Sequence, residues 1–298
     1  MKSTDIALVL FMNIAFGAAF ISAKIGVSYF PPFLFTSMRF LIIAVLLLPF
    51  LKLHQGQMFN ILFISLLGGA FHFAFFYLAL DNSTHISSVA ILLQLGTPFA
   101  TILSVIFLGE IIRWKRFLGI FLAFAGVVIL IFEPTIFSDL GGVYYALLAA
   151  FSISVSLLFM KKLKNIKVFD LQVWIAWTSF IFLAFISLLV EDNQILIIQS
   201  ASINAWIAVI FTAIVATGIG HAGFYYLLTK YDVSRITPLT LLAPVLAITN
   251  ALIITYFSIF DGFDETITLK ILLGGSLTLI GVAIVMIREK ENEIVSTV

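Results

Sequence analysis

The chain is a succession of long apolar runs separated by short polar breaks. An α-helix needs about 17–25 apolar residues to cross the hydrocarbon core of a bilayer. Backbone groups in hydrocarbon must pair within their own segment, and the runs are too long for the strands of a membrane barrel, so we predict helices. The ten runs lie at 5–27, 31–51, 58–80, 85–108, 115–132, 139–160, 169–190, 203–228, 234–257 and 268–287.

The composition agrees with a membrane protein. Hydrophobic residues make up 62% of the 298 residues and charged residues 10%, whereas soluble domains carry about 25% charged residues. So little polar surface could not cover a soluble fold, and we expect an all-α polytopic protein embedded in a lipid bilayer. Only "MKSTD" precedes the first run, which is long for a signal-peptide core, so we expect it to be retained. The net charge of +1 argues against a nucleic-acid partner, and the absence of Cys excludes disulfides and thiolate metal sites.

The basic residues indicate how the helices are oriented. With the N-terminus placed in the cytoplasm, all but three of the 16 Lys and Arg residues fall in segments predicted to be cytoplasmic. The three exceptions, Lys24, Arg39 and Lys270, lie within helices or at their edges. This distribution follows the positive-inside rule. It predicts ten membrane-spanning helices with both termini in the cytoplasm.

Two halves of the chain share a pattern of glycines and charged residues. A Glu, a Lys and two Gly recur with every member displaced by 155 positions: Glu110, Lys115, Gly119 and Gly126 match Glu265, Lys270, Gly274 and Gly281. "LGTPFATIL" around Pro98 likewise matches "LLAPVLAIT" around Pro244. A third match pairs Gly69 with Gly218, His72 with His221, and Tyr77 with Tyr226.

Each half contains five predicted helices. Because five is odd, the second half enters the membrane upside down relative to the first. Inverted repeats are typical of secondary transporters, in which the halves exchange conformations and so change the side on which a central site opens. We predict two inverted five-helix repeats, at 1–135 and 136–298.

Three stretches carry a family resemblance. "PPFLFTSMRFLIIAVLLLP", "VAILLQLGTPFATILSVIFLGE" and "YDVSRITPLTLLAPV" resemble the EamA branch of the drug/metabolite transporter superfamily, and within it bacterial amino-acid and metabolite exporters of the O-acetylserine/cysteine exporter type. The resemblance covers both repeats. It implies a carrier in the bacterial cytoplasmic membrane whose first four helices in each repeat surround a central cavity. The chain departs from the family pattern at "SIFDGFDE", where a compact "LGE" is usual.

Polar and aromatic residues inside the helices are candidates for the wall of such a cavity, because polar groups are costly in lipid. The predicted cavity residues are Asn13, Phe20, Lys24, Arg39, His72, Phe76, Gln94, Thr97, Thr217, His221, Tyr225 and Thr240.

The first of these candidates lie on the helices predicted at 5–27 and 31–51. Asn13, Phe20 and Lys24 share a helix face, which fits a cavity lining, although Lys24 would equally reach the outer interface by snorkelling. Arg39 is about 12 Å past the start of its helix at 1.5 Å per residue. A guanidinium there could hold a substrate carboxylate, or it could bind helix-end carbonyls or a loop acid.

The two histidines are the candidates for proton coupling. The helix cores predicted from the sequence contain no Asp or Glu, and histidine titrates near physiological pH. His72 and His221 could therefore relay a proton, or each could be a neutral imidazole bonded to a neighbouring group.

Two prolines suggest hinges. Pro98 and Pro244 occupy paired places, and a proline within a helix frees a carbonyl and permits bending. A static kink is the alternative. The nearby Gln94, Thr97 and Thr240 could face substrate, but Ser and Thr also bond back to their own helix.

No motif for an enzyme, a cofactor or a metal site is found. Neither a P-loop nor an H-E-x-x-H pair occurs. We predict a secondary transporter, not an enzyme, that acts on a small-molecule substrate as a monomer or weak homodimer and exports metabolites such as amino acids. The alternatives are a multidrug or nucleoside carrier of the same fold, a membrane-embedded enzyme, and a membrane scaffold.

Overall fold

The computed structural model describes residues 3–109, 114–133, 139–160, 163–230, 240, 242–259 and 265–286, and every regular element among them is helical. Six helical segments are long and apolar enough to cross a membrane. They are Ser3–Tyr29, Met58–Asp81, Ile86–Phe107, Leu140–Met160, Val168–Val190 and Ile203–Phe224. Shorter apolar helices lie within the other four predicted runs, at Pro32–Leu46, Phe117–Ile131, Leu242–Tyr256 and Leu269–Val285.

The elements are as follows. The first half contains α1 (Ser3–Tyr29), α2 (Pro32–Leu46), η1 (Leu48–Phe50), α3 (Met58–Ile64), η2 (Ser65–Phe71), α4 (His72–Asp81), α5 (Ile86–Leu92), η3 (Leu93–Leu95), α6 (Gly96–Leu108) and α7 (Trp114–Ile131). The second half contains α9 (Leu140–Met160), α10 (Val168–Val190), α11 (Gln194–Ser200), α12 (Ile203–Ile210), η4 (Phe211–His221), α13 (Ala222–Lys230), α15 (Leu242–Tyr256) and α16 (Leu269–Met286).

Local sequence explains several boundaries. Pro32 is the first residue of α2, where its missing N–H costs nothing. The same helix ends at Leu46, five residues before the end of the predicted run at 51, because the chain approaches Pro49 and tightens into the 3₁₀ turn η1. Gly109 ends α6 with φ of 67°, a left-handed conformation that glycine adopts without steric cost. Residues 234–239 of another predicted helix lie outside the described part of the chain.

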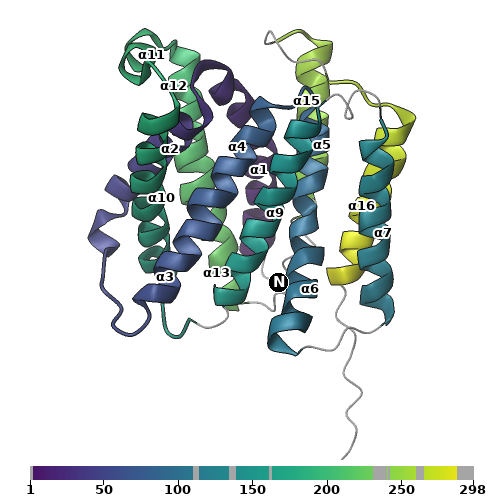
Figure 1. Cartoon of the computed structure of the whole chain (residues 1–298), viewed down its shortest axis with the longest axis horizontal. Helices are drawn as coiled ribbons and strands as arrows, with labels where there is room; N and C mark the ends of the chain where they lie inside the picture. Colours follow the sequence, from purple (N-terminus) through teal and green to yellow (C-terminus); the bar gives the residue numbers. More distant parts are fainter. Residues whose placement is uncertain are drawn as a thin grey trace, which may run out of the picture.

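Helices α7 and α16 pack side by side at one edge of the molecule, as Figure 1 shows. Their glycines bring the backbones together: a Cβ added at Gly281 would lie 2.6 Å from the Gly119 carbonyl oxygen, and one at Gly274 would lie 2.7 Å from that of Gly126. The two contacts correspond through the repeat: Gly119 matches Gly274, and Gly281 matches Gly126, each 155 positions apart. Contacts that exchange in this way are what a local twofold axis produces.

The hydrogen bond between the same two helices lies on that axis. Thr278 Oγ1 donates to the Ala123 carbonyl at 3.3 Å, and these two residues are themselves 155 positions apart. The repeated glycines found in the sequence therefore lie where α7 of the first repeat crosses α16 of the second.

The upper end of the molecule is held by acidic side chains that accept backbone N–H groups from the other half of the chain. Glu191 accepts from Phe33 at 2.8 Å and from Leu34 at 2.9 Å, at the start of α2. Glu265 accepts from Ile86 at 2.8 Å and from Ser87 at 3.3 Å, at the start of α5. Carboxylates at helix N-termini satisfy donors that have no intrahelical partner. Figure 1 shows this end at the top, beside α11.

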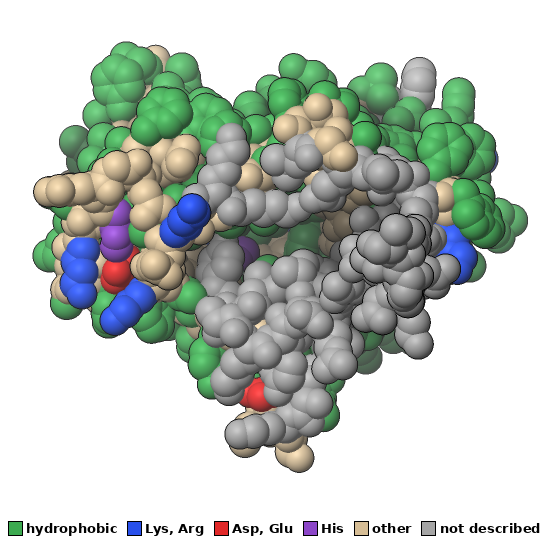
Figure 2. All heavy atoms as spheres, turned by 90° about the horizontal axis from the view of Figure 1, so that it is seen from below, with side chains coloured by type: hydrophobic (Ala, Val, Ile, Leu, Met, Phe, Trp, Pro, Cys, Tyr) green, Lys and Arg blue, Asp and Glu red, His purple; other side chains and the backbone are tan. Residues whose placement is uncertain are grey.

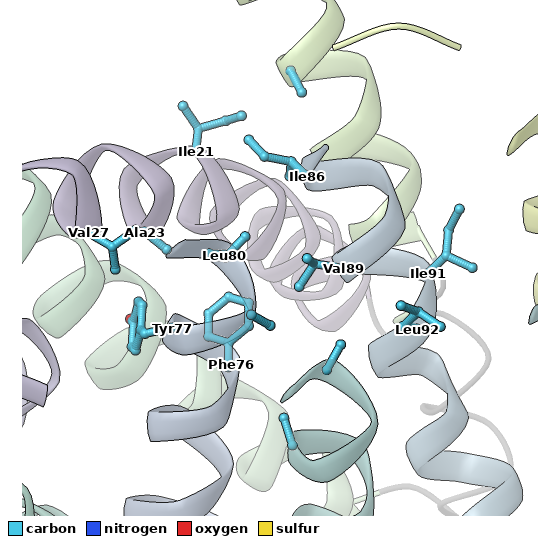
Figure 3. Close-up of a cluster of buried hydrophobic side chains, with 14 of the residues drawn as sticks. Ile21, Ala23, Val27, Phe76, Tyr77, Leu80, Ile86, Val89, Ile91 and Leu92 are labelled. Atoms are coloured by element: carbon cyan, nitrogen blue, oxygen red, sulfur yellow. The ribbon is translucent and has the colours of Figure 1, made fainter. Parts of the chain in front are cut away.

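A buried apolar cluster joins α1 to α4 and α5 beneath this end. Figure 3 shows Ala23 and Val27 of α1 facing α4, which contributes Tyr77 and Leu80. These four side chains are at most 7% exposed. The cluster fixes α1 and α4 as a unit and so positions the polar residues that lie below it.

Candidate functional site

The two predicted histidines occupy matching places next to irregular helix turns. His72 is the first residue of α4 and directly follows η2, whereas His221 is the last residue of η4. Both η2 and η4 are π-helical. π-helical turns are rare and occur frequently at functional sites. Their presence at the same place in both repeats agrees with the sequence match of the histidines.

Neighbouring helices supply hydrogen-bond donors to carbonyls of these turns. Ser156 Oγ of α9 donates to the Ile64 carbonyl at 3.3 Å, and Ser179 Oγ of α10 donates to the Ser65 carbonyl at 3.4 Å. In η4, Gln172 Nε2 donates to the Thr217 carbonyl at 2.7 Å. Carbonyls of irregular helix turns at membrane depth need such partners, because lipid offers none. The wide turns are thus stabilised by residues far away in sequence.

Phe73 is the common contact of the candidate residues. Its ring centroid lies 4.8 Å from that of His72 and 5.9 Å from that of His221. The guanidinium carbon of Arg39 lies 4.3 Å from the same ring centroid. The structure therefore gathers one cation and two imidazoles, from α2, α4 and η4, around a single aromatic ring.

The side chains of His72 and His221 are partly accessible, and the lower face of the molecule is hollowed (Figure 2). Both are partly exposed, although they lie midway along apolar helices. Figure 2, a view from below, shows the middle of the lower face hollowed, with histidine and hydrophobic side chains visible in its depth. His72 Nδ1 lies 2.9 Å from the Ala149 carbonyl, which an Nδ1–H tautomer satisfies. His221 packs against Phe16, with ring centroids 5.0 Å apart.

Arg39 is buried and donates to hydroxyl groups. Its side chain is 2% exposed, and its Nη atoms donate to Tyr77 Oη and to Thr217 Oγ1. Thr217 Oγ1 in turn donates at 3.0 Å to the Thr212 carbonyl, five residues back, which is the spacing of a π-turn. The guanidinium is therefore tied directly to η4.

Lys24 donates hydrogen bonds to backbone carbonyls at the end of α4. Its Nζ donates to the carbonyls of Leu80 at 2.6 Å and Ser83 at 2.5 Å, at the end of α4. A cation there satisfies free carbonyls and the helix dipole. Near it, Phe20 meets Phe76 edge to face at 5.3 Å. These three residues lie closer to the upper end than the histidines do.

Other predicted cavity residues bond within their own helix. Asn13 is buried, and its Nδ2 donates to the Val9 carbonyl at 2.8 Å, while its Oδ1 has no partner. Gln94, in η3, is partly exposed, and its Nε2 donates to the Ala90 carbonyl at 3.4 Å. Thr97 is partly exposed at the start of α6. They remain candidates, but the described contacts do not join them to the histidine group.

The predicted hinge prolines have the same place in their helices. Pro98 is the third residue of α6 and follows the 3₁₀ turn η3; Pro244 is the third residue of α15. Thr240 is partly exposed and precedes α15. The side chain of Tyr225 lies outside the described part of the structure.

Sequence reasoning missed Phe73, Phe16 and Gln172, and it treated Tyr77 only as a repeat match. Tyr77 could have been found because it pairs with Tyr226 in the repeat. Gln172 could have been found as a buried amide, 3% exposed, within an otherwise apolar helix. Phe73 and Phe16 carry no such signal among 32 phenylalanines.

The described residues contain no cluster of three or more His, Asp or Glu that could hold a metal ion. Two carboxyl groups outside the spans, both at the upper end, have shifted pKa values. Burial raises the pKa of the Glu265 carboxyl above its usual range, against the hydrogen bonds from Ser87 and Ile86 and the neighbouring His85. Burial likewise raises the pKa of Glu191.

Comparison with known proteins gives the family. The EamA-like transporter family matches residues 4–132 and 140–287. The chain belongs to this family. A protein of Escherichia coli (strain K12) named "Probable amino-acid metabolite efflux pump" is 27% identical over 95% of each chain. A protein of the same name from Salmonella typhimurium is also 27% identical over 95% of each chain.

A further relative and a solved structure are similar to this chain over nearly its whole length. An "Uncharacterized transporter" of Archaeoglobus fulgidus is 26% identical over 94% of this chain and 98% of its own. A solved crystal structure with 16% identity matches 95% of this chain and 96% of that one with a TM-score of 0.62. Membership of the family, together with the apolar helices, makes this chain a membrane transport protein with the two-repeat EamA fold.

Proposed function

We propose that this EamA protein is a secondary transporter of the bacterial cytoplasmic membrane that exports small organic metabolites, amino acids or related compounds, by alternating access. The observation that carries the proposal is the grouping of His72, His221 and Arg39 around Phe73 beside the hollow. The paired elements of two inverted repeats meet there, which is where such carriers bind substrate. The relatives named for amino-acid metabolite efflux support the substrate class.

We propose ten membrane-spanning helices, both termini in the cytoplasm, and repeats bounded at 1–135 and 136–298. Six described helices have the length and composition of a span, and the shorter apolar helices would complete the set. The N-terminus lies at the lower side of Figure 1. The lower face would then be cytoplasmic, in keeping with the positive-inside rule.

This proposed orientation also implies which side of the membrane the site faces. The hollow opens on the lower face (Figure 2), so the site would face the cytoplasm. At the upper end, Glu191 and Glu265 join the second repeat to the starts of α2 and α5 in the first. We propose that these contacts close the outer side, and that their release, with bending near Pro98 and Pro244, opens it. The carrier would work as a monomer or weak homodimer in lipid.

A counterflow assay in proteoliposomes tests the proposal. Purified protein is reconstituted into vesicles loaded with a high concentration of one compound, and entry of its radiolabelled form is measured. The panel contains the twenty standard amino acids, nucleosides and cationic dyes, each with and without a pH gradient. We expect counterflow of one or more amino acids, and none in protein-free vesicles.

The other outcomes discriminate between functions. Counterflow of dyes or nucleosides alone would refute the proposed substrate class but would still support transport by alternating access. No counterflow of any compound would contradict the proposal and favour an enzyme or a scaffold.

A further inference from the structure

Arg39 is a buried cation that has no carboxylate partner among the described residues. Its side chain is 2% exposed, and neither of the described histidine–carboxylate contacts, His54 with Asp170 and His85 with Glu265, involves it. An isolated charge in a low-dielectric interior is costly, so buried cations are normally paired with an anion. A fixed positive charge near the middle of a transport protein therefore requires an explanation.

The guanidinium also has unused hydrogen-bonding capacity. It carries five N–H groups, and the described bonds to Tyr77 and Thr217 use two of them. The buried Nε has no partner. The Nε–H and the second N–H of the neighbouring Nη atom form a planar fork that matches the two oxygens of a carboxylate.

Three aromatic rings compensate part of the charge. The guanidinium carbon lies 5.0 Å, 4.3 Å and 5.3 Å from the ring centroids of Phe40, Phe73 and Tyr77. The negative faces of these rings attract the cation, but less strongly than a hydrogen-bonded anion in the same surroundings would. They hold the cation in place, while the fork stays without an acceptor.

The position of the cation links it to the hollow. The Phe73 ring contacts the guanidinium and also both partly exposed histidines. Phe73 thus connects Arg39 with the two histidines of the candidate site. Because Arg39 is only 2% exposed, a neighbouring side chain such as Phe73 must move before a bound molecule can reach the fork.

We infer that Arg39 binds the carboxylate of the transported substrate, so that the site selects metabolites with a free carboxylate and rejects organic cations, esters and amides. The inference rests on the proposed transport function and names the group that the site recognises. A carboxylate would supply the missing acceptors, whereas an ammonium without one would meet a fixed like charge. Tyr77 and Thr217 hold the guanidinium for this contact.

The test compares compounds that differ only in the carboxylate. The amino acid with the fastest counterflow is compared with its amide, its methyl ester and its decarboxylated amine, as unlabelled competitors and as counterflow substrates. We expect the three derivatives to be exchanged at least about tenfold more slowly, the discrimination that one good hydrogen-bonded contact provides at roughly 1.4 kcal/mol per tenfold. Wild-type protein that exchanges the amide as fast as the acid would overturn the inference.

Two variants assign the preference to Arg39. Arg39→Gln should exchange acid and amide at similar low rates, and Arg39→Lys should keep part of the preference, because it retains the charge but loses the fork. Thr249→Val, at an exposed hydroxyl that bonds to its own helix, is the matched control and should keep the full preference. An unchanged preference in Arg39→Gln would also overturn the inference.

Two further measurements distinguish a failure of this inference from a failure of the variant to fold or of the proposed function. If Arg39→Gln does not fold, the wild-type ratio of acid to amide exchange still tests the inference, as does its pH dependence. A guanidinium keeps its charge, so the ratio should be constant from pH 5 to 7, where the α-amino groups of both the acid and the amide are largely protonated, whereas anchoring by a histidine would make the ratio fall as the pH rises. Exchange of the amine or the ester but not the acid would refute this inference and leave the proposed function standing; no exchange of any compound would refute the proposed function.

Discussion

The crossing of α7 and α16 and the histidine group around Phe73 are both places where the two repeats meet, but they are built in opposite ways. At the crossing, glycines allow backbone-to-backbone contact, and Thr278 bonds to Ala123 on the local twofold axis. Around Phe73, the helices contain π-turns, the histidines are partly exposed, and carbonyls rely on Gln172, Ser156 and Ser179.

This difference in packing indicates which part of the molecule can move during transport. Close-packed backbones at the crossing have no alternative arrangement nearby, because protein interiors resist small displacements. The π-turns and the hollow leave room for rearrangement, and their hydrogen bonds come from side chains that can rotate. We therefore regard α7 and α16 as a fixed support and the helices around Phe73 as the moving part.

The largest effect on stability is expected when a methyl group is added where α7 and α16 cross. A Cβ at Gly281 would lie 2.4 Å from the Ala123 backbone nitrogen, so the two helices must separate. Gly281→Ala should destabilise the protein by roughly 1–3 kcal/mol, the usual cost of overpacking, measured by thermal unfolding of purified protein in detergent.

The matched control is the same substitution at Gly141 near the start of α9. The nearest atom to a Cβ there is 3.6 Å away, an ordinary contact. Gly141→Ala should be neutral or slightly stabilising, because alanine favours a helix. Equal melting temperatures for the two variants would refute the close crossing.

The second effect concerns proton coupling in the moving part. His221→Gln removes a titratable group whose described contacts are the rings of Phe16 and Phe73. We expect gradient-driven transport to fall about tenfold while substrate exchange changes less than twofold, because only the driven step requires a proton. His72→Gln can still donate to the Ala149 carbonyl and is the paired comparison. If both variants keep both activities with unchanged pH dependence, the histidines are structural.

The smallest effect is a change in the pH dependence of stability. Burial raises the pKa of Glu265, so this carboxyl binds its proton more tightly in the folded protein than in the unfolded chain. Its contribution to stability is thus fully present below the ordinary glutamate pKa and is lost as the pH rises through the raised value. Thermal unfolding between pH 4 and 8 should give a flatter profile for Glu265→Gln than for the wild type.

Asp192→Asn, at an exposed carboxylate, is the control and should leave the profile unchanged. His85 and Lys24 lie near enough to Glu265 to influence it electrostatically, so the difference between the two profiles, and not either profile alone, reports on the Glu265 carboxyl. A steeper profile in this variant than in the wild type would contradict the assigned direction.

Periodicity and repeats predicted much of this architecture. The apolar runs mark the helices, and the displacement of 155 positions predicts the glycines that meet at α7 and α16. The pairing of His72 with His221 also follows from the sequence. These features depend on local composition and on the match between the two halves of the chain, both of which a sequence displays directly.

The remaining features depend on partners far away in sequence. The carbonyls that hold Lys24 are 56 and 59 residues away, so spacing within its own helix could not distinguish capping from cavity lining or snorkelling. The π-turns form where donors from α9 and α10 arrive. In a regular helix Phe76 lies on the same face as His72, four residues before it. The ring that contacts both histidines is nevertheless Phe73, because His221 approaches from another helix.

Labelling of a single cysteine at position 221 tests the central claim of alternating access most directly. The chain has no cysteine of its own, so His221→Cys gives one reactive site in the hollow. Membrane-impermeant maleimide is applied to inside-out and right-side-out vesicles, with and without the transported amino acid on the outer side. The account predicts fast labelling from the cytoplasmic side and slow labelling from outside, with substrate outside increasing the second at the expense of the first. Equal labelling from both sides regardless of substrate, or labelling from neither, would contradict it.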